Sequence, residues 1–117
     1  MKKSFVLLLC VLVCTMLLTS IASAADDVKK VAIILDPVGV NPFLTQVVDK
    51  FAEVKAAGTY PMDYSVIECA DDTAWAENIR ASVEEGYDLI LVVGWQGADP
   101  LNEVATQFPD KAQYVII

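Results

Sequence analysis

Residues 86–95 read GYDLILVVGW, and the middle of this stretch decides the fold. Leu89–Val93 is an unbroken apolar run, with Gly86 and Gly94 on either side of it. A short apolar run between turn residues is typical of a strand that is buried on both faces of a parallel sheet. Similar runs predict three more strands, at residues 31–35, 64–67 and 114–117.

Segments with helical periodicity separate these strands. Asn41 and Pro42 are expected to open the first helix, because Asn is a favourable cap and the missing N–H of Pro costs nothing in the first turn. Gly58 is expected to end this helix. Asp99 and Pro100 repeat the same arrangement and predict the start of the third helix.

The second helix is expected to start near Asp72 or Thr73 and to end at Gly86, with four residues on its buried side: Trp75, Ala76, Ile79 and Val83. The resulting order, βαβαβαβ, predicts an α/β fold, a doubly wound, flavodoxin-like parallel sheet with helices on both faces. Ligands of such sheets bind outside the carboxyl ends of the strands. The site is therefore expected in the loops at residues 36–43, 68–73 and 94–99.

The amino terminus has the pattern of a secretory signal peptide. Lys2 and Lys3 precede an apolar run over Phe5–Leu18, and Ala22–Ala24 forms an A-x-A cleavage site. The run of 14 residues is shorter than the roughly 20 that a membrane-spanning helix needs, which disfavours the alternative of an uncleaved anchor. We expect cleavage after Ala24 and export.

Removal of residues 1–24 leaves one small domain, residues 25–117, with 6 Lys and Arg against 16 Asp and Glu. The resulting net charge of −10 disfavours binding to nucleic acid and to anionic membranes. The chain has no His, and Cys69 is the one cysteine left, which excludes a disulfide, a zinc cluster and a Ser-His or Cys-His pair. We expect neither cofactor nor metal and no enzymatic activity. The final apolar strand predicts that the domain is truncated.

The loop after the first strand offers a carboxylate, a carboxamide and an aromatic ring in Asp36, Asn41 and Phe43. These groups suit a neutral polar ligand that is held by hydrogen bonds and stacking. The alternative is that Asp36 and Asn41 are turn and cap residues and that Phe43 belongs to the core. Gly94 and Trp95 follow the third strand as further candidates, while Trp95 could instead pack against a missing half of the molecule.

Polar residues also follow the second strand. Asp71 and Asp72 could serve acid–base chemistry, with Asp36 as a partner in an exported enzyme, or a Ca²⁺ site. Helix capping is the favoured interpretation of both. Cys69 is expected to be a small apolar filler, and Gln96, after the third strand, is a weaker ligand candidate.

GYDLILVVGW and the residues after it, 98–101, 103–105, 108–111 and 114–117, resemble the basic membrane protein family of ABC-transporter substrate-binding proteins, the purine nucleoside receptor-like lipoproteins. The resemblance covers the chain from about Val31 onward. It implies a type I periplasmic binding protein, in which a ligand, often a nucleoside, is trapped between two lobes and delivered to a membrane permease. Residues 25–117 are then part of the amino-terminal lobe, and a second lobe is needed to close the cleft.

Asp36, Gly39 and Phe43 match the family's first loop, whose aromatic ring stacks on the base, although the Asp-x-Ser part of that loop is absent. The stretch 41–43, Asn-Pro-Phe, is instead similar to an element of ribose-type sugar-binding proteins, which makes a sugar the alternative ligand. A ligand-sensing protein outside transport is a further alternative.

Many members of the resembled family are lipoproteins. In this chain Cys10 follows Leu9 and Cys14 follows Val13, where lipoprotein processing requires a small residue. We therefore expect a released protein in the periplasm of a Gram-negative cell rather than a tethered one.

Overall fold

The computed structural model describes residues 27–117, and the predicted signal peptide at residues 1–24 lies outside this part of the chain. Within it, one parallel sheet contains four strands: β1 (Lys29–Leu35), β2 (Met62–Glu68), β3 (Leu89–Val93) and β4 (Gln113–Ile116). Each coincides with a predicted strand. The first begins two residues earlier than predicted, because the Lys29 N–H donates to the Pro61 carbonyl at the start of the β1–β2 ladder.

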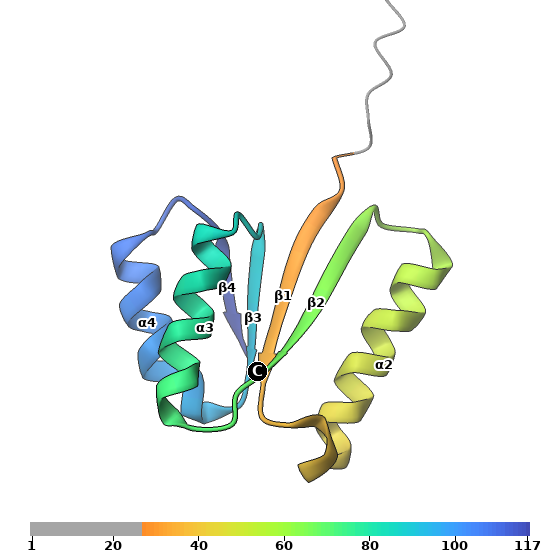
Figure 1. Ribbon diagram of the computed structural model, residues 1–117. Helices are drawn as coiled ribbons and strands as arrows, with labels where there is room; N and C mark the ends of the chain where they lie inside the picture. The colour runs from red at the N-terminus through yellow and green to blue at the C-terminus, as the bar shows by residue number, and fades with distance from the viewer. Residues whose placement is uncertain (1–26) are drawn as a thin grey trace, which may run out of the picture.

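Helices connect these strands: α2 (Pro42–Ala57), α3 (Asp72–Glu84) and α4 (Ala98–Gln107), with the 3₁₀ turns η2 (Val38–Val40) and η3 (Trp95–Gly97) before α2 and α4. One face of the sheet carries α2, and the opposite face carries α3 and α4 (Figure 1). The predicted α/β fold with helices on both faces is therefore confirmed.

The strand order is β2-β1-β3-β4, so the chain reverses its direction of travel across the sheet. It runs from β1 outward to β2, then crosses back over β1 to form β3 and continues to β4. The register sets Val31 of β1 opposite Tyr64 of β2 and Leu89 of β3. The reversal lies between β1 and β3, which is where open α/β sheets bind ligands at the carboxyl ends of their strands.

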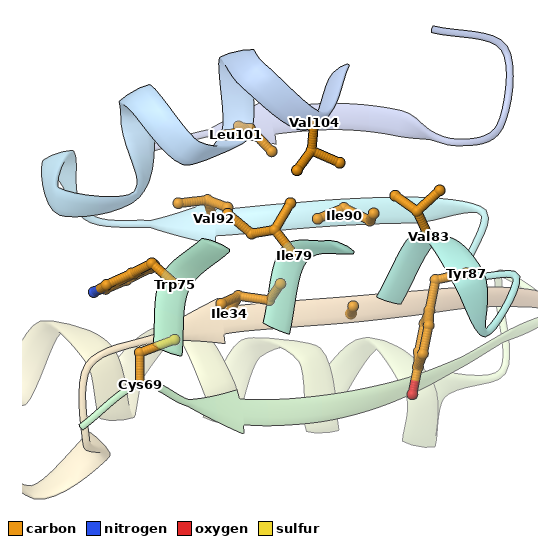
Figure 2. Close-up of a cluster of buried hydrophobic side chains, with 11 residues drawn as sticks. Ile34, Cys69, Trp75, Ile79, Val83, Tyr87, Ile90, Val92, Leu101 and Val104 are labelled. Carbon is orange, nitrogen blue, oxygen red and sulfur yellow. The ribbon is translucent and has the colours of Figure 1, made fainter. Parts of the chain in front are cut away.

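Two hydrophobic clusters lie on the two faces of the sheet, because successive strand residues point to opposite sides. Ile33 and Leu35 pack towards α2. Ile34 of β1 joins the larger cluster, where α3 contributes Trp75 and Ile79 (Figure 2). All of these side chains are at most 2% exposed, and residues 31–35 of β1 are buried, as the sequence predicts, whereas Lys29 and Lys30 are exposed.

The edge strands depart from the prediction that all four are buried on both faces. Val66 of β2 is 36% exposed and Val115 of β4 is 42% exposed, because each strand has a neighbour on one side only. The predicted burial of Ala76 is also wrong. The buried side of α3 is completed by Ser82, whose hydroxyl donates to the Asn78 carbonyl, and Ala76 faces solvent.

The start of α4 also differs from the prediction. The helix begins at Ala98, and its N-cap is Gly97, which makes no side-chain capping bond. Since η3 runs directly into α4, Pro100 becomes the third helical residue rather than the first. Its missing N–H still belongs to the four that have no partner within a helix, so the proline is tolerated. None of the helices between residues 27 and 117 has the length and apolar character needed to cross a bilayer.

Candidate functional site

A cavity of about 360 Å³ lies at the carboxyl ends of β1 and β3, where the strand order reverses. The structure brings five predicted site residues to its wall and leaves out the sixth, Gly39, which is exposed on η2. The wall is formed by Asp36, Val40, Asn41, Phe43, Leu44, Val93, Gly94, Trp95, Gln96 and Ile117.

A larger cavity, of about 510 Å³, lies at the amino ends of the strands, beside Lys29, Met62 and Leu89. It contains none of the predicted site residues. The amino termini of α2, α3 and α4 follow the opposite ends of the strands, where their free N–H groups and the loops can meet a ligand. We therefore assign the candidate site to the smaller cavity.

Asp36 is half-buried at the end of β1, and its carboxylate oxygen Oδ2 accepts a hydrogen bond of 3.0 Å from Nε2 of Gln96. Gln96 lies in η3, after β3, so this bond joins the loops of the two central strands. Sequence reasoning treated Gln96 as a weaker candidate, since nothing in its position along the chain indicated that its side chain would reach Asp36.

The loop after β1 is also held from the other side. The N–H of Val38 donates to Oε1 of Glu68 at 2.9 Å, and Glu68 is the last residue of the neighbouring strand β2. The Thr45 hydroxyl of α2 donates to the Val38 carbonyl at 3.4 Å. Sequence reasoning missed Glu68 as a site-supporting residue, and its place at a strand end was the available signal. These bonds fix the loop before any ligand arrives.

The structure confirms the structural interpretation of Asn41 and rejects that of Phe43. Oδ1 of Asn41 accepts from the Phe43 N–H at 2.9 Å, which confirms the capping role. The side-chain N–H₂ of Asn41 is not used in that bond and is a donor at the cavity wall. Phe43 is 50% exposed, so the alternative that it belongs to the core is wrong.

Trp95 is 82% exposed at the rim of the cavity, although Trp is an apolar residue. The turn that presents it starts at Gly94, whose φ of 127° and ψ of 143° favour glycine. The Gly94 N–H donates to the Ile117 carbonyl at 3.0 Å, which ties the turn to the end of the sheet. Phe43 and Trp95 thus supply two exposed aromatic rings to one cavity.

The residues after β2 have structural roles. Oδ1 of Asp71 accepts from the N–H groups of Thr73 and Ala74, both at 3.0 Å, so Asp71 caps α3 as predicted. Cys69 is 1% exposed in the larger hydrophobic cluster, which confirms its role as a filler. Burial raises the pKa of its thiol, and the carboxylates of Asp36 and Asp71 add to that rise. Between residues 27 and 117, no three His, Cys, Asp or Glu residues form a group that could hold a metal ion.

The chemistry of the cavity suits a polar ligand that carries no negative charge. Among the described residues that line it, Asp36 carries the one charged side chain. A carboxylate oxygen accepts hydrogen bonds from hydroxyl or amine donors, and the two exposed rings can stack on a flat or apolar face. An anion would meet the Asp36 charge without a compensating cation.

Sequence comparison finds two curated relatives. No model of a known protein family matches the chain. Two curated relatives, both described as a "CD4+ T-cell-stimulating antigen", come from Listeria monocytogenes and Listeria innocua. Each is 26% identical over 132 residues, and the alignment covers 99% of this chain and 37% of the relative. The chain therefore spans 37% of the length of the curated relatives that it matches.

Several solved structures are similar to this chain. An ABC transporter solute-binding protein from Conexibacter woesei is 30% identical, with a TM-score of 0.63, and the match covers 74% of this chain and 28% of that protein. A fragment from Peptoclostridium difficile 630, assigned as a lipoprotein, is 32% identical, with a TM-score of 0.62 and coverage of 75% and 71%. The chain belongs to the same protein family as this lipoprotein fragment, and its α/β fold is that of a solute-binding protein domain.

Proposed function

We propose that this chain is part of an exported substrate-binding component of an ABC importer, of the basic membrane protein family, and that it binds a nucleoside-like solute. The observation that carries the proposal is the convergence of Asp36, Asn41, Phe43 and Trp95 on one cavity at the reversal of strand order. The likeness to an ABC transporter solute-binding protein supports the same role. We propose binding without chemistry and without a cofactor.

The proposed mode of binding follows from the groups at the wall. Asp36 accepts hydrogen bonds from ligand hydroxyls, and the Asn41 side-chain amide donates to a ligand acceptor. Phe43 and Trp95 contact the flat face of a base. Because good sites bury about 70–90% of a ligand, this wall needs an opposing one, which we propose is a second lobe.

The proposed partners are a small polar solute and an ABC permease in the inner membrane. The proposed location is the periplasm, after removal of the signal peptide at Ala24. The solved relatives support a place outside the cytoplasm, since lipoproteins and ABC solute-binding proteins are usually extracellular or periplasmic. Mass spectrometry of the mature amino terminus tests this: a free Ala25 supports release, whereas a lipidated Cys14 contradicts it.

A ribose-type sugar is the second candidate ligand. The observation that favours it is the capped Asn-Pro-Phe turn, in which Asn41 and Phe43 both reach the cavity wall. A thermal-shift screen of nucleosides and pentoses, followed by calorimetry, separates the two ligand classes. A rise of the melting temperature with nucleosides alone supports the first proposal, a rise with pentoses alone supports the second, and no response to either class overturns both.

Transport and sensing use the same cleft, so ligand binding does not distinguish them. The gene neighbourhood does. An adjacent permease gene and an ATPase gene support import, whereas an adjacent sensor-kinase gene and no permease gene support a role in ligand sensing.

A further inference from the structure

The hydrogen bond from Gln96 to Asp36 is built into the turn that carries Gln96. A Cβ atom placed on Gly94 would lie 2.8 Å from Oε1 of Gln96, so the Gln96 side chain folds back over the space that glycine leaves open. Nε2 of the same amide then donates to Oδ2 of Asp36. The absence of a side chain at Gly94 thus makes room for the bridge between the two loops.

The other end of the turn is equally constrained. A Cβ atom on Gly97 would lie 2.4 Å from Cγ1 of Val92 and 2.8 Å from Cε3 of Trp75. Trp75 is 2% exposed and belongs to the larger hydrophobic cluster (Figure 2). The turn therefore lies directly on the core, which fixes the position of the backbone that carries Gln96.

We propose that Gln96 is a positioning residue that fixes the Asp36 carboxylate and thereby makes the cavity select neutral, donor-rich solutes against anionic ones. This inference rests on the proposed solute-binding function. With Oδ2 of Asp36 held by Gln96, Oδ1 receives no hydrogen bond from residues 27–117 and is the acceptor offered to a ligand.

Selectivity follows from the fixed position of the charge. A neutral solute gains a hydrogen bond to an acceptor that is already oriented, so little side-chain entropy is lost on binding. An anionic solute of the same shape meets a negative charge that cannot rotate away, and like charges in contact oppose binding. A carboxylate freed from Gln96 would turn towards solvent and discriminate less between the two solutes.

The first arm of the test needs no ligand. Thermal melting at pH 7 is compared for the wild type, Asp36→Asn, Gln96→Glu and the double variant. Gln96→Glu sets two carboxylates against each other and should lower the melting temperature, whereas the double variant restores a carboxylate–amide pair with exchanged roles and should recover most of the loss. Additive effects of the two substitutions would show that the side chains are not coupled and would overturn the inference.

The second arm measures selectivity by NMR titration of the purified protein with two matched pairs, uridine with uridine 5′-monophosphate and ribose with ribose 5-phosphate. The wild type should bind one neutral compound at least about tenfold more tightly than its phosphate. Gln96→Ala should weaken the neutral compound about fivefold and lower this ratio. A merely structural role would weaken both compounds equally and leave the ratio unchanged, which would contradict the inference.

The two arms separate the failure of this inference from that of the proposed function. If neither neutral compound binds the wild type, the solute-binding function fails and the selectivity claim fails with it, whereas the melting data still decide whether the bridge forms. If a neutral compound binds but Gln96→Ala leaves the ratio intact, the function stands and only the role of Gln96 is wrong.

Discussion

Gln96 and Asp36 are hydrogen-bonded at 3.0 Å although 60 residues separate them in the chain. The bond joins the loops that follow β3 and β1, the two neighbouring strands between which the strand order reverses. Glu68, at the end of β2, holds the same loop from its other side through the N–H of Val38. The carboxyl edge of the sheet is thus a set of loops tied to one another, and such prior organisation lowers the cost of ordering them around a ligand.

The conformation of Gly94 predicts that its substitution lowers the stability of the protein. Gly94→Ala should destabilise the protein by about 1–3 kcal/mol, because alanine does not adopt this conformation without strain and its Cβ would displace the Gln96 amide. Urea denaturation measures the loss. Gly39→Ala is the matched control, since a Cβ atom there meets nothing within 4 Å, and equal destabilisation of both variants would contradict the account.

The two tryptophans should behave as opposites. Trp75→Ala should cost about 3–5 kcal/mol of unfolding free energy, because the side chain is 2% exposed in the core. Trp95→Ala should change the stability by less than about 0.5 kcal/mol, because the ring is 82% exposed. Acrylamide quenching checks the same difference without denaturant: the fluorescence that remains in Trp95→Phe should resist quenching, and that in Trp75→Phe should not.

Asp71 should matter through two hydrogen bonds rather than through its charge. Asp71→Ala removes the acceptor of the Thr73 and Ala74 N–H groups and should cost about 1 kcal/mol, measured by chemical denaturation. Asp72→Ala, at the next position, removes a first-turn charge and should cost less. A larger loss for Asp72→Ala would show that the charge, not the cap, stabilises α3.

Cys69 predicts a loss of stability at alkaline pH. Burial raises the pKa of its thiol above the ordinary 9.0, so the native state keeps the proton after the unfolded chain has released it. The contribution of this thiol to the free energy of unfolding is fully present below pH 9. It declines as the pH rises further, since the unfolded state then binds fewer protons than the native state. Denaturation between pH 7 and pH 10 should show a shallower decline in Cys69→Ala, and identical slopes would contradict this assignment.

The order of elements could be predicted from the sequence because each signal is local. The apolar run Leu89–Val93 and the capped start at Asn41 depend on neighbouring residues alone, and both were right. The start of α4 was wrong because the conformation of η3, not the Asp99-Pro100 pair, decides where the helix begins. The preceding turn thus overrides the local signal for a helix start.

Only those residues of the candidate site that directly follow a strand could be predicted from the sequence. Asp36 and Trp95 follow strands, so the rule for open sheets was sufficient to bring them together. The contact of Gln96 with Asp36 depends on the conformation of the turn over Gly94–Gly97, which lies against Val92 and Trp75. The support that Glu68 gives to Val38 likewise depends on the β1–β2 register, which no short stretch of sequence specifies.

The most direct test of the proposed function is an NMR titration of the isotope-labelled protein with uridine and with ribose at millimolar concentrations, where even weak binding by a single wall is detected. We expect one of the two compounds to shift the amide signals of residues 93–96 and of the residues other than proline in the range 36–44. Asp36→Asn, which removes a charged acceptor, should weaken this response roughly tenfold. No response to either compound, or shifts confined to the cavity beside Lys29 and Leu89, would contradict the proposal that this edge of the sheet binds a solute.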